Sequence, residues 1–258
     1  MKGRNTMNFH TFGDSANSKM LLIHGVLCPW QIWSEAVEHY SDKYFVIVPE
    51  LDGHTQDAPS EFISIQEEAA HIEECLHTEN ITELDVLCGL SMGGGVAAKL
   101  WENGNVRINN LVLDGAPLTK AGGMTTRFIT GFYVDIVRKS KQRDPKTLEN
   151  CKKVFLPAKH LDNYQRVADH MSDASITNVC HSILQNTFPK NVSAEGMRIL
   201  YMYGTKSNES LSKKSAKLLK KRYKNIMLRA CKGMMHGELF CFHPMEWLKI
   251  VDDFLGQR

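Results

Sequence analysis

The sequence lacks any apolar run long enough to cross a membrane, and the stretch from Met1 to Asp14 contains no apolar signal core. It also lacks a regular cysteine framework, because its seven cysteines are odd in number and irregularly spaced. Such cysteines are typical of reduced thiols rather than of a disulfide scaffold. These absences predict a cytoplasmic protein without a membrane partner.

An excess of charge of one sign is missing as well, since the formal net charge is only +2. Two basic stretches, 138–143 and 213–222, carry no interleaved aromatic residues and are interpreted as solvated helix faces. No clustered His, Cys and Asp spacing suits a metal, and no dinucleotide fingerprint appears. We therefore expect no metal, no cofactor and no nucleic-acid partner. The sequence does not indicate an oligomeric state.

Short apolar segments that alternate with amphipathic ones are the main pattern present. The segments that predict buried strands are 20–23, 44–48, 84–88, 111–113, 198–203 and 226–230. Between the second and third of these, Ile65, Ala69, Ile72 and Leu76 recur with helical spacing. In a chain of 258 residues with 43% hydrophobic residues, this alternation predicts an α/β fold with a mostly parallel, doubly wound sheet.

The strand pattern disappears between residues 119 and 197, where helical patterns take over. We interpret this block as a helical insertion, with residues 1–118 and 198–258 forming the core. Ligands of open α/β sheets bind at the carboxyl ends of the strands. The site is therefore expected at that edge, beneath the insertion.

One serine stands in a glycine-rich segment at a predicted strand-to-helix junction. The segment Gly89-Leu90-Ser91-Met92-Gly93 matches G-x-S-x-G, the pattern of a nucleophile elbow. In such a turn the serine takes a strained conformation, and side chains two positions to either side would clash with neighbouring backbone. The helix N-terminus beneath the serine would stabilise developing negative charge.

Four motifs in order along the chain together resemble the α/β-hydrolase-fold serine hydrolases, in particular the small bacterial esterase-like type with a helical cap. They are Leu22-Ile23-His24-Gly25, Gly89 to Gly94, Leu111 to Pro117, and Gly233-Met234-Met235-His236-Gly237-Glu238. The resemblance implies the chain order nucleophile, acid, histidine. His236, which follows the last predicted strand in a glycine-flanked loop, is accordingly expected to be the general base for Ser91.

The resemblance also implies an oxyanion hole formed by the backbone N–H groups of Val26 and Met92. His24 is expected to order the loop that carries Val26 by hydrogen bonding. The turn Glu50-Leu51-Asp52-Gly53-His54 occupies the place of the family's Asp-Leu-Pro-Gly-His turn, and we assign it a structural role.

The acid of the triad is not settled by the sequence. The family's acid usually lies three residues beyond the glycine that ends the penultimate strand, and here Ser207 holds that position after Gly204. Glu209 can fill the role if the loop is longer than usual, and it is the residue we select. Asp114 is the alternative site, and a triad without a carboxylate is the third possibility.

These residues predict an enzyme that cleaves a carboxylic ester, or a thioester or amide, through an acyl-enzyme on Ser91. Its partner would be a small-molecule ester or acyl substrate. An acyltransferase that uses the same acyl-enzyme is one alternative. A catalytically weak ligand-binding member of the fold is the other, and the serine at position 207 motivates it.

Overall fold

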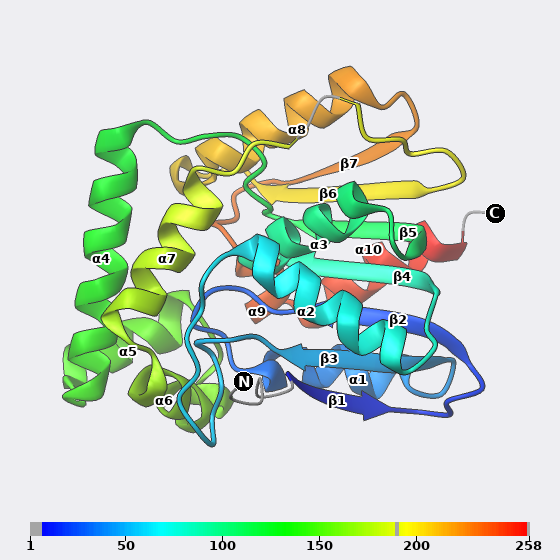
Figure 1. Ribbon diagram of the computed structural model, residues 1–258. Coiled ribbons are helices and arrows are strands. Elements are labelled where there is room, and N and C mark those ends of the chain that lie inside the picture. The colour runs from blue at the N-terminus through cyan, green and yellow to red at the C-terminus, as the bar shows by residue number, and fades with distance from the viewer. Residues whose placement is uncertain (1–6, 189–190, 257–258) are drawn as a thin grey trace.

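In a computed structural model, which describes residues 7–188 and 191–256, the chain forms one sheet covered by helices on both faces (Figure 1). The strands are β1 (Asn8–Phe12), β2 (Ser18–Ile23), β3 (Tyr44–Glu50), β4 (Glu83–Leu90), β5 (Arg107–Asp114), β6 (Arg198–Gly204) and β7 (Ile226–Cys231). Their order across the sheet is β1-β3-β2-β4-β5-β6-β7. All neighbouring pairs are parallel except β1 with β3. The predicted α/β-hydrolase architecture, a mostly parallel doubly wound sheet, is confirmed.

Helices on both sides explain why the central strands are continuous apolar runs. The helices of the sheet region are α1 (Ser34–Tyr40), α2 (Ile65–Thr78), α3 (Met92–Asn103), α8 (Ser210–Arg222), α9 (Glu238–Phe242) and α10 (Pro244–Gly256). In Figure 1, α2 and α3 lie in front of the sheet and α1 and α10 behind it. Met20 to Ile23 of β2 are consequently 0% exposed. The residues of α2 that show helical spacing, from Ile65 to Leu76, are buried against α3.

The block between β5 and β6 is helical throughout its regular elements. It contains α4 (Gly123–Lys141), α5 (Pro145–Val154), α6 (Leu161–His170) and α7 (Asp173–Leu184). These helices gather beside the carboxyl ends of the parallel strands, at the left of Figure 1. Two aromatic side chains of α4 face solvent, since Phe128 is 76% and Phe132 49% exposed. The division into a core and a cap insertion stays a prediction.

Three local features differ from what the apolar pattern alone indicated. The edge strand β1 was not predicted, because its sequence NFHTF carries few apolar residues and pairs on one side only. The segment from Trp30 to Tyr40 begins with a 3-10 turn, η1 (Trp30–Trp33), before α1. The C-terminal helical segment is divided into α9 and α10 at Pro244, a residue that favours the first turn of a helix.

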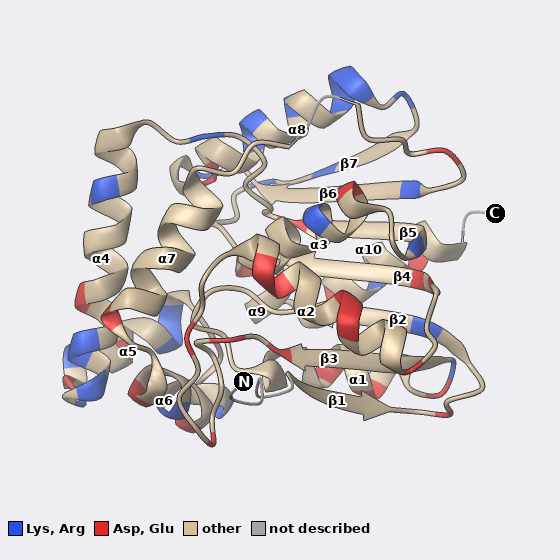
Figure 2. Ribbon diagram, in the orientation of Figure 1, with Lys and Arg blue, Asp and Glu red and all other residues tan. Residues whose placement is uncertain are grey.

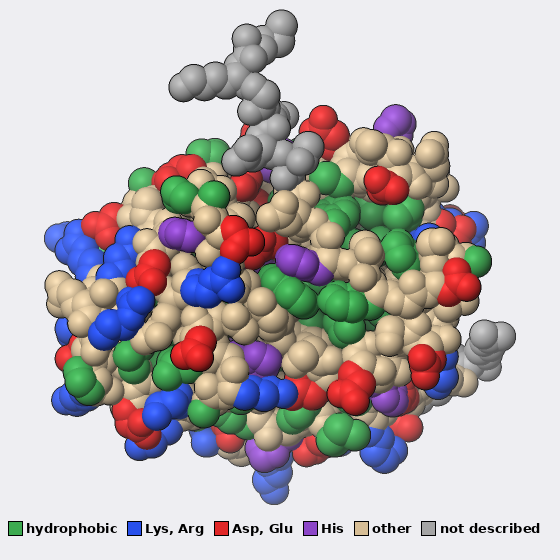
Figure 3. Space-filling model, turned by 90° about the horizontal axis from the view of Figure 1, so that it is seen from below, with side chains coloured by type: hydrophobic (Ala, Val, Ile, Leu, Met, Phe, Trp, Pro, Cys, Tyr) green, Lys and Arg blue, Asp and Glu red, His purple; other side chains and the backbone are tan. Residues whose placement is uncertain are grey.

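The surface carries charges of both signs. Basic side chains are concentrated on α8 and near the end of α4, and acidic ones lie along α2 (Figure 2). On the face seen from below, acidic and basic groups are interspersed around a gathering of hydrophobic side chains (Figure 3).

Within the described residues, none of the helices combines the length and the apolarity that crossing a membrane would require.

Candidate active site

Ser91 lies in a strained turn between β4 and α3. Its backbone has φ 51° and ψ −112°, a positive φ that is uncommon for a residue other than glycine. A Cβ on Gly89 would lie 2.5 Å from the carbonyl oxygen of Gly93, and a Cβ on Gly93 would lie 2.2 Å from that of Ile23. Only glycine therefore fits at either position. Close packing of the backbone holds the serine at the carboxyl edge of the sheet.

His236 meets Ser91 although the two residues are 145 positions apart. Nε2 of the imidazole lies 2.8 Å from Oγ of Ser91, and the hydroxyl donates this hydrogen bond when the proton of the ring is on Nδ1. The imidazole rests against the backbone at the end of β5, because a Cβ on Gly115 would lie 2.7 Å from Cε1 of His236. The end of β5 thus supports the ring from one side.

Glu209 contacts the imidazole of His236 on the side opposite Ser91. It ends a 3-10 turn, η3 (Ser207–Glu209), and its side chain is 0% exposed. Oε2 lies 3.3 Å from Nδ1 of His236, and Oε1 accepts a hydrogen bond of 3.0 Å from the backbone N–H of Gly204. The structure therefore brings together Ser91, His236 and Glu209, in that order.

The two other positions considered for the acid are arranged differently. Ser207 is exposed at the start of the 3-10 turn. Asp114, at the end of β5, is 5% exposed, and its Oδ2 accepts a hydrogen bond of 3.0 Å from Nε1–H of Trp247 on α10. Asp114 is thus a second buried carboxylate near the imidazole, held by an indole.

Burial and mutual charge set the protonation of these groups. Burial alone would lower the pKa of His236, but the close contact with Glu209 and its charge, with the charge of Asp114, raise it above its ordinary value. Burial alone would raise the pKa of Glu209, and the interactions with His236 lower it overall. Burial, together with the charge of Glu209, raises the pKa of Asp114 to about 6. Both carboxylates are therefore ionised at neutral pH, and Glu209 is the one that contacts Nδ1 of the imidazole.

The loop from His24 to Cys28 lies beside the serine. A Cβ on Gly25 would lie 3.5 Å from Cβ of Ser91, so the backbone that leads to Val26 passes next to Ser91. Nδ1 of His24 lies 3.0 Å from the carbonyl oxygen of Gly25, and Nε2 accepts a hydrogen bond of 3.3 Å from the N–H of Leu51. Burial lowers the pKa of His24 to about 4, so the ring is neutral and links this loop to the turn after β3.

The N–H groups of Val26 and Met92 belong to the two backbone segments that flank Ser91. Met92 is the first residue of α3, and Val26 lies in a tight turn in which the N–H of Cys28 donates to the carbonyl oxygen of Gly25 at 3.2 Å. The next residue, Leu27, has a positive φ of 57°. Both segments are therefore fixed by local geometry, as an oxyanion hole requires.

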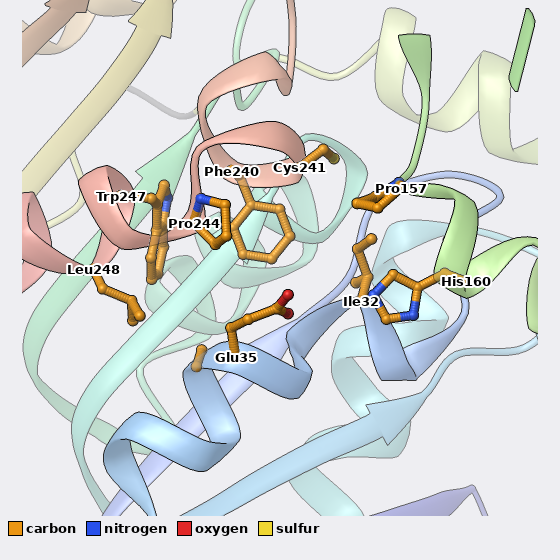
Figure 4. Close-up of a pocket in the computed structure, with 10 residues that line it drawn as sticks. Ile32, Glu35, Pro157, His160, Phe240, Cys241, Pro244, Trp247 and Leu248 are labelled. Carbon is orange, nitrogen blue, oxygen red and sulfur yellow. The ribbon is translucent and has the colours of Figure 1, made fainter. Parts of the chain in front are cut away.

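A small pocket lies elsewhere, between α1, α9, α10 and the segment before α6 (Figure 4). The carboxylate of Glu35 and the imidazole of His160 point into it, opposite the ring of Phe240. Its volume of about 10 Å³ is roughly that needed by one water molecule. Since neither Ser91 nor His236 lines it, this pocket is not the place where the serine would meet a substrate.

Two residues near the imidazole were not identified from the sequence. The sequence indicates Gly115 only as part of a motif, and its role as a support for His236 depends on a contact across 121 positions, from 115 to 236. Trp247 had no distinguishing signal, because a tryptophan on an amphipathic helix is ordinarily a core residue. Only its hydrogen bond to Asp114 distinguishes Trp247 from an ordinary core tryptophan.

Comparison with known sequences gives a limited match. No family model matches the sequence. A curated relative, (E)-2-((N-methylformamido)methylene)succinate hydrolase of Acinetobacter baylyi, is 32% identical over 90 residues. The match spans 34% of this chain and 34% of the relative, which is about a third of each protein.

Comparison with solved structures covers nearly the whole chain. An esterase of Exiguobacterium antarcticum superposes with a TM-score of 0.74 at 18% identity, covering 97% of this chain and 96% of its own. The enol-lactonase of Burkholderia xenovorans LB400 has a TM-score of 0.72 at 17% identity, with 97% and 96% covered. A Desulfitobacterium hafniense protein described as an α/β hydrolase family member has a TM-score of 0.75 at 20% identity, with 96% and 100% covered. This chain therefore has the α/β-hydrolase fold, as its motifs predicted.

Proposed function

We propose that this protein is a serine hydrolase that cleaves a carboxylic ester, or a thioester or amide, through an acyl-enzyme on Ser91. The observation that carries the proposal is the 2.8 Å contact between Oγ of Ser91 and Nε2 of His236. A general base within hydrogen-bond distance of a hydroxyl is the arrangement that activates a serine nucleophile. The hydrolases and esterases among the relatives and structural neighbours agree with this reaction class.

In the proposed reaction, Ser91 attacks the carbonyl carbon while Nε2 of His236 takes the hydroxyl proton. The carboxylate of Glu209, 3.3 Å from Nδ1, stabilises the imidazolium that forms. The N–H groups of Val26 and Met92 bind the oxyanion, and each such donor contributes about 3 kcal/mol in the transition state. His236 then returns the proton to the leaving group, and water hydrolyses the acyl-enzyme by the same steps in reverse order.

The ligand-binding alternative rested on a missing acid at position 207. Because Glu209 lies beside the imidazole, that reason for expecting a weak catalyst no longer applies. Acyl transfer to an alcohol or amine shares the first half of the mechanism. It differs from hydrolysis only in the molecule that accepts the acyl group from Ser91.

Labelling with a fluorophosphonate tests the proposal directly. We expect one covalent adduct per chain, on the peptide that contains Ser91, because an activated serine reacts with phosphorus as it does with a carbonyl. Mass spectrometry of the digested protein would locate the adduct, and Ser207→Ala serves as a matched control that should label fully. An unlabelled protein, or an adduct elsewhere, would contradict the assignment.

Product analysis with an added alcohol would show whether water or the alcohol is the acceptor.

The pH dependence provides a second test. Protonated His236 cannot accept the serine proton, so kcat/KM should be lost at low pH and gained as the pH rises through the pKa of the imidazole. Since Glu209 raises that pKa above its ordinary value of 6.5, we expect the midpoint above pH 6.5. Rates of ester hydrolysis between pH 5 and 9 would measure it. A flat profile in this range would argue against His236 as the base.

A further inference from the structure

The turn after β3 and the first half of α2 bring three metal-binding side chain types together, apart from the serine site. Asp52 lies on the turn, and Glu68 and His71 are one helical turn apart on α2. Nδ1 of His71 lies 3.2 Å from Oδ2 of Asp52, and Oε2 of Glu68 accepts a hydrogen bond of 3.1 Å from the N–H of Asp52. One potential ligand atom from each residue lies within 4.8 Å of the other two. We call this group the Asp52 cluster.

Glu68 is the unusual member of the Asp52 cluster. Its side chain is 0% exposed, and its Oε1 has no hydrogen-bond partner among the residues that the structure describes. A buried carboxylate oxygen without a partner is destabilising, because it has lost its hydration and gained nothing in return.

We propose that Asp52, Glu68 and His71 form a binding site for one divalent first-row metal ion, of which Zn²⁺ and Co²⁺ are suitable probes. One imidazole with two carboxylates suits these ions better than Mg²⁺ or Ca²⁺, which prefer oxygen ligands alone. Two ligands at about 2.1 Å from a tetrahedral ion are roughly 3.4 Å apart. The observed 3.2 Å between His71 and Asp52 is close to this spacing. An ion would also supply a partner for Oε1 of Glu68.

The site would act on structure rather than on the serine chemistry, and it does not depend on the proposed function. The chain between Asp52 and Ile65 joins β3 to α2 and contacts α7, where the N–H of Phe62 donates to Oγ of Ser175 at 2.9 Å. The N–H of Ile65 donates to Oγ of Ser182, also at 2.9 Å. An ion that links the turn at Asp52 to α2 would hold both ends of this connecting segment. Bound metal would therefore stabilise the contact between the sheet region and α7.

Metal titration of the full-length protein tests the proposal. After dialysis against EDTA, Zn²⁺ should bind with a stoichiometry of one by isothermal titration calorimetry. It should also raise the unfolding temperature by about 5 °C or more at a hundredfold excess over Kd. Co²⁺ should give a visible absorption band that reports nitrogen and oxygen ligands. Absence of stoichiometric binding by both ions would overturn the proposal.

Variants assign the binding to the Asp52 cluster. His71→Ala and Glu68→Gln should each abolish the stoichiometric binding and the rise in unfolding temperature, and circular dichroism would establish that both are folded. His71 is partly exposed, so its alanine variant keeps the test decisive even if the buried Glu68→Gln does not fold. His77→Ala and Glu74→Gln change exposed residues of the same helix and should bind as the unaltered protein does. Unchanged binding by folded His71→Ala would place the ion elsewhere and refute the site.

Discussion

Replacing Ser91 with alanine is expected to lower kcat for ester hydrolysis by about six orders of magnitude, the usual cost of removing a serine nucleophile. The fold should persist, because the hydroxyl makes one hydrogen bond, to His236, and the loss of one such bond costs about 1 kcal/mol. Ser91 is only 9% exposed, so the alanine methyl group fills nearly the same space. Hydrolysis of a short-chain p-nitrophenyl ester, with thermal unfolding measured in parallel, would check both expectations.

Ser207→Ala is the control for this experiment. Ser207 is exposed and lies on η3, two residues before Glu209, so its replacement should leave kcat and the unfolding temperature close to those of the unaltered protein. If Ser91→Ala kept more than a few per cent of the activity, the nucleophile would be another residue and the proposed function would fail.

Glu209→Gln is expected to have the next largest effect, a fall in kcat of about 10⁴-fold. Glutamine keeps the shape of the side chain and can still accept the hydrogen bond from Gly204, but it carries no charge to stabilise the imidazolium. The same change removes the interaction that raises the pKa of His236. The midpoint of the pH profile should therefore move to lower pH together with the loss of rate, a signature that simple misfolding would not produce.

Two further variants separate Glu209 from the other candidate acids. Asp114→Asn should reduce kcat little, because asparagine can still accept the hydrogen bond from Trp247 and the pair formed by Glu209 and His236 stays intact. Ser207→Asp should give no gain, since position 207 is exposed on the turn. The opposite pattern, an active Glu209→Gln and an inactive Asp114→Asn, would assign the acid to Asp114.

Features of the site that depend on local packing could be predicted from the sequence. The elbow is an example, because the glycines at 89 and 93 are imposed by backbone atoms within or beside the same turn. The parallel sheet was predictable for a similar reason, since a strand buried on both faces must be apolar throughout. For the acid the sequence selected Glu209 but left Asp114 and no carboxylate as alternatives, because the path of residues 205–209 depends on contacts with a distant loop. The N–H groups of Thr205 and Lys206 both donate to the carbonyl oxygen of Met234.

The Asp52 cluster shows the same limit more strongly. Asp52 and Glu68 are 16 positions apart and carry no metal-ligand spacing in sequence, so the absence of such a spacing led us to expect no metal. Their approach depends on how the segment after β3 returns to α2. A ligand set formed by a turn and a helix can be seen only once both are placed in space.

The separation of Ser91 and His236 along the chain has a consequence for the protein as it is being made. The two residues are 145 positions apart, and ribosomes add roughly 5–20 residues per second. The histidine is therefore synthesised about 7–29 s after the serine. During that interval the nascent chain already carries the glycine-rich segment but lacks the base, and Glu209 itself is added only 27 residues before His236. A growing polypeptide cannot acylate itself by the proposed mechanism until its last tenth has been translated.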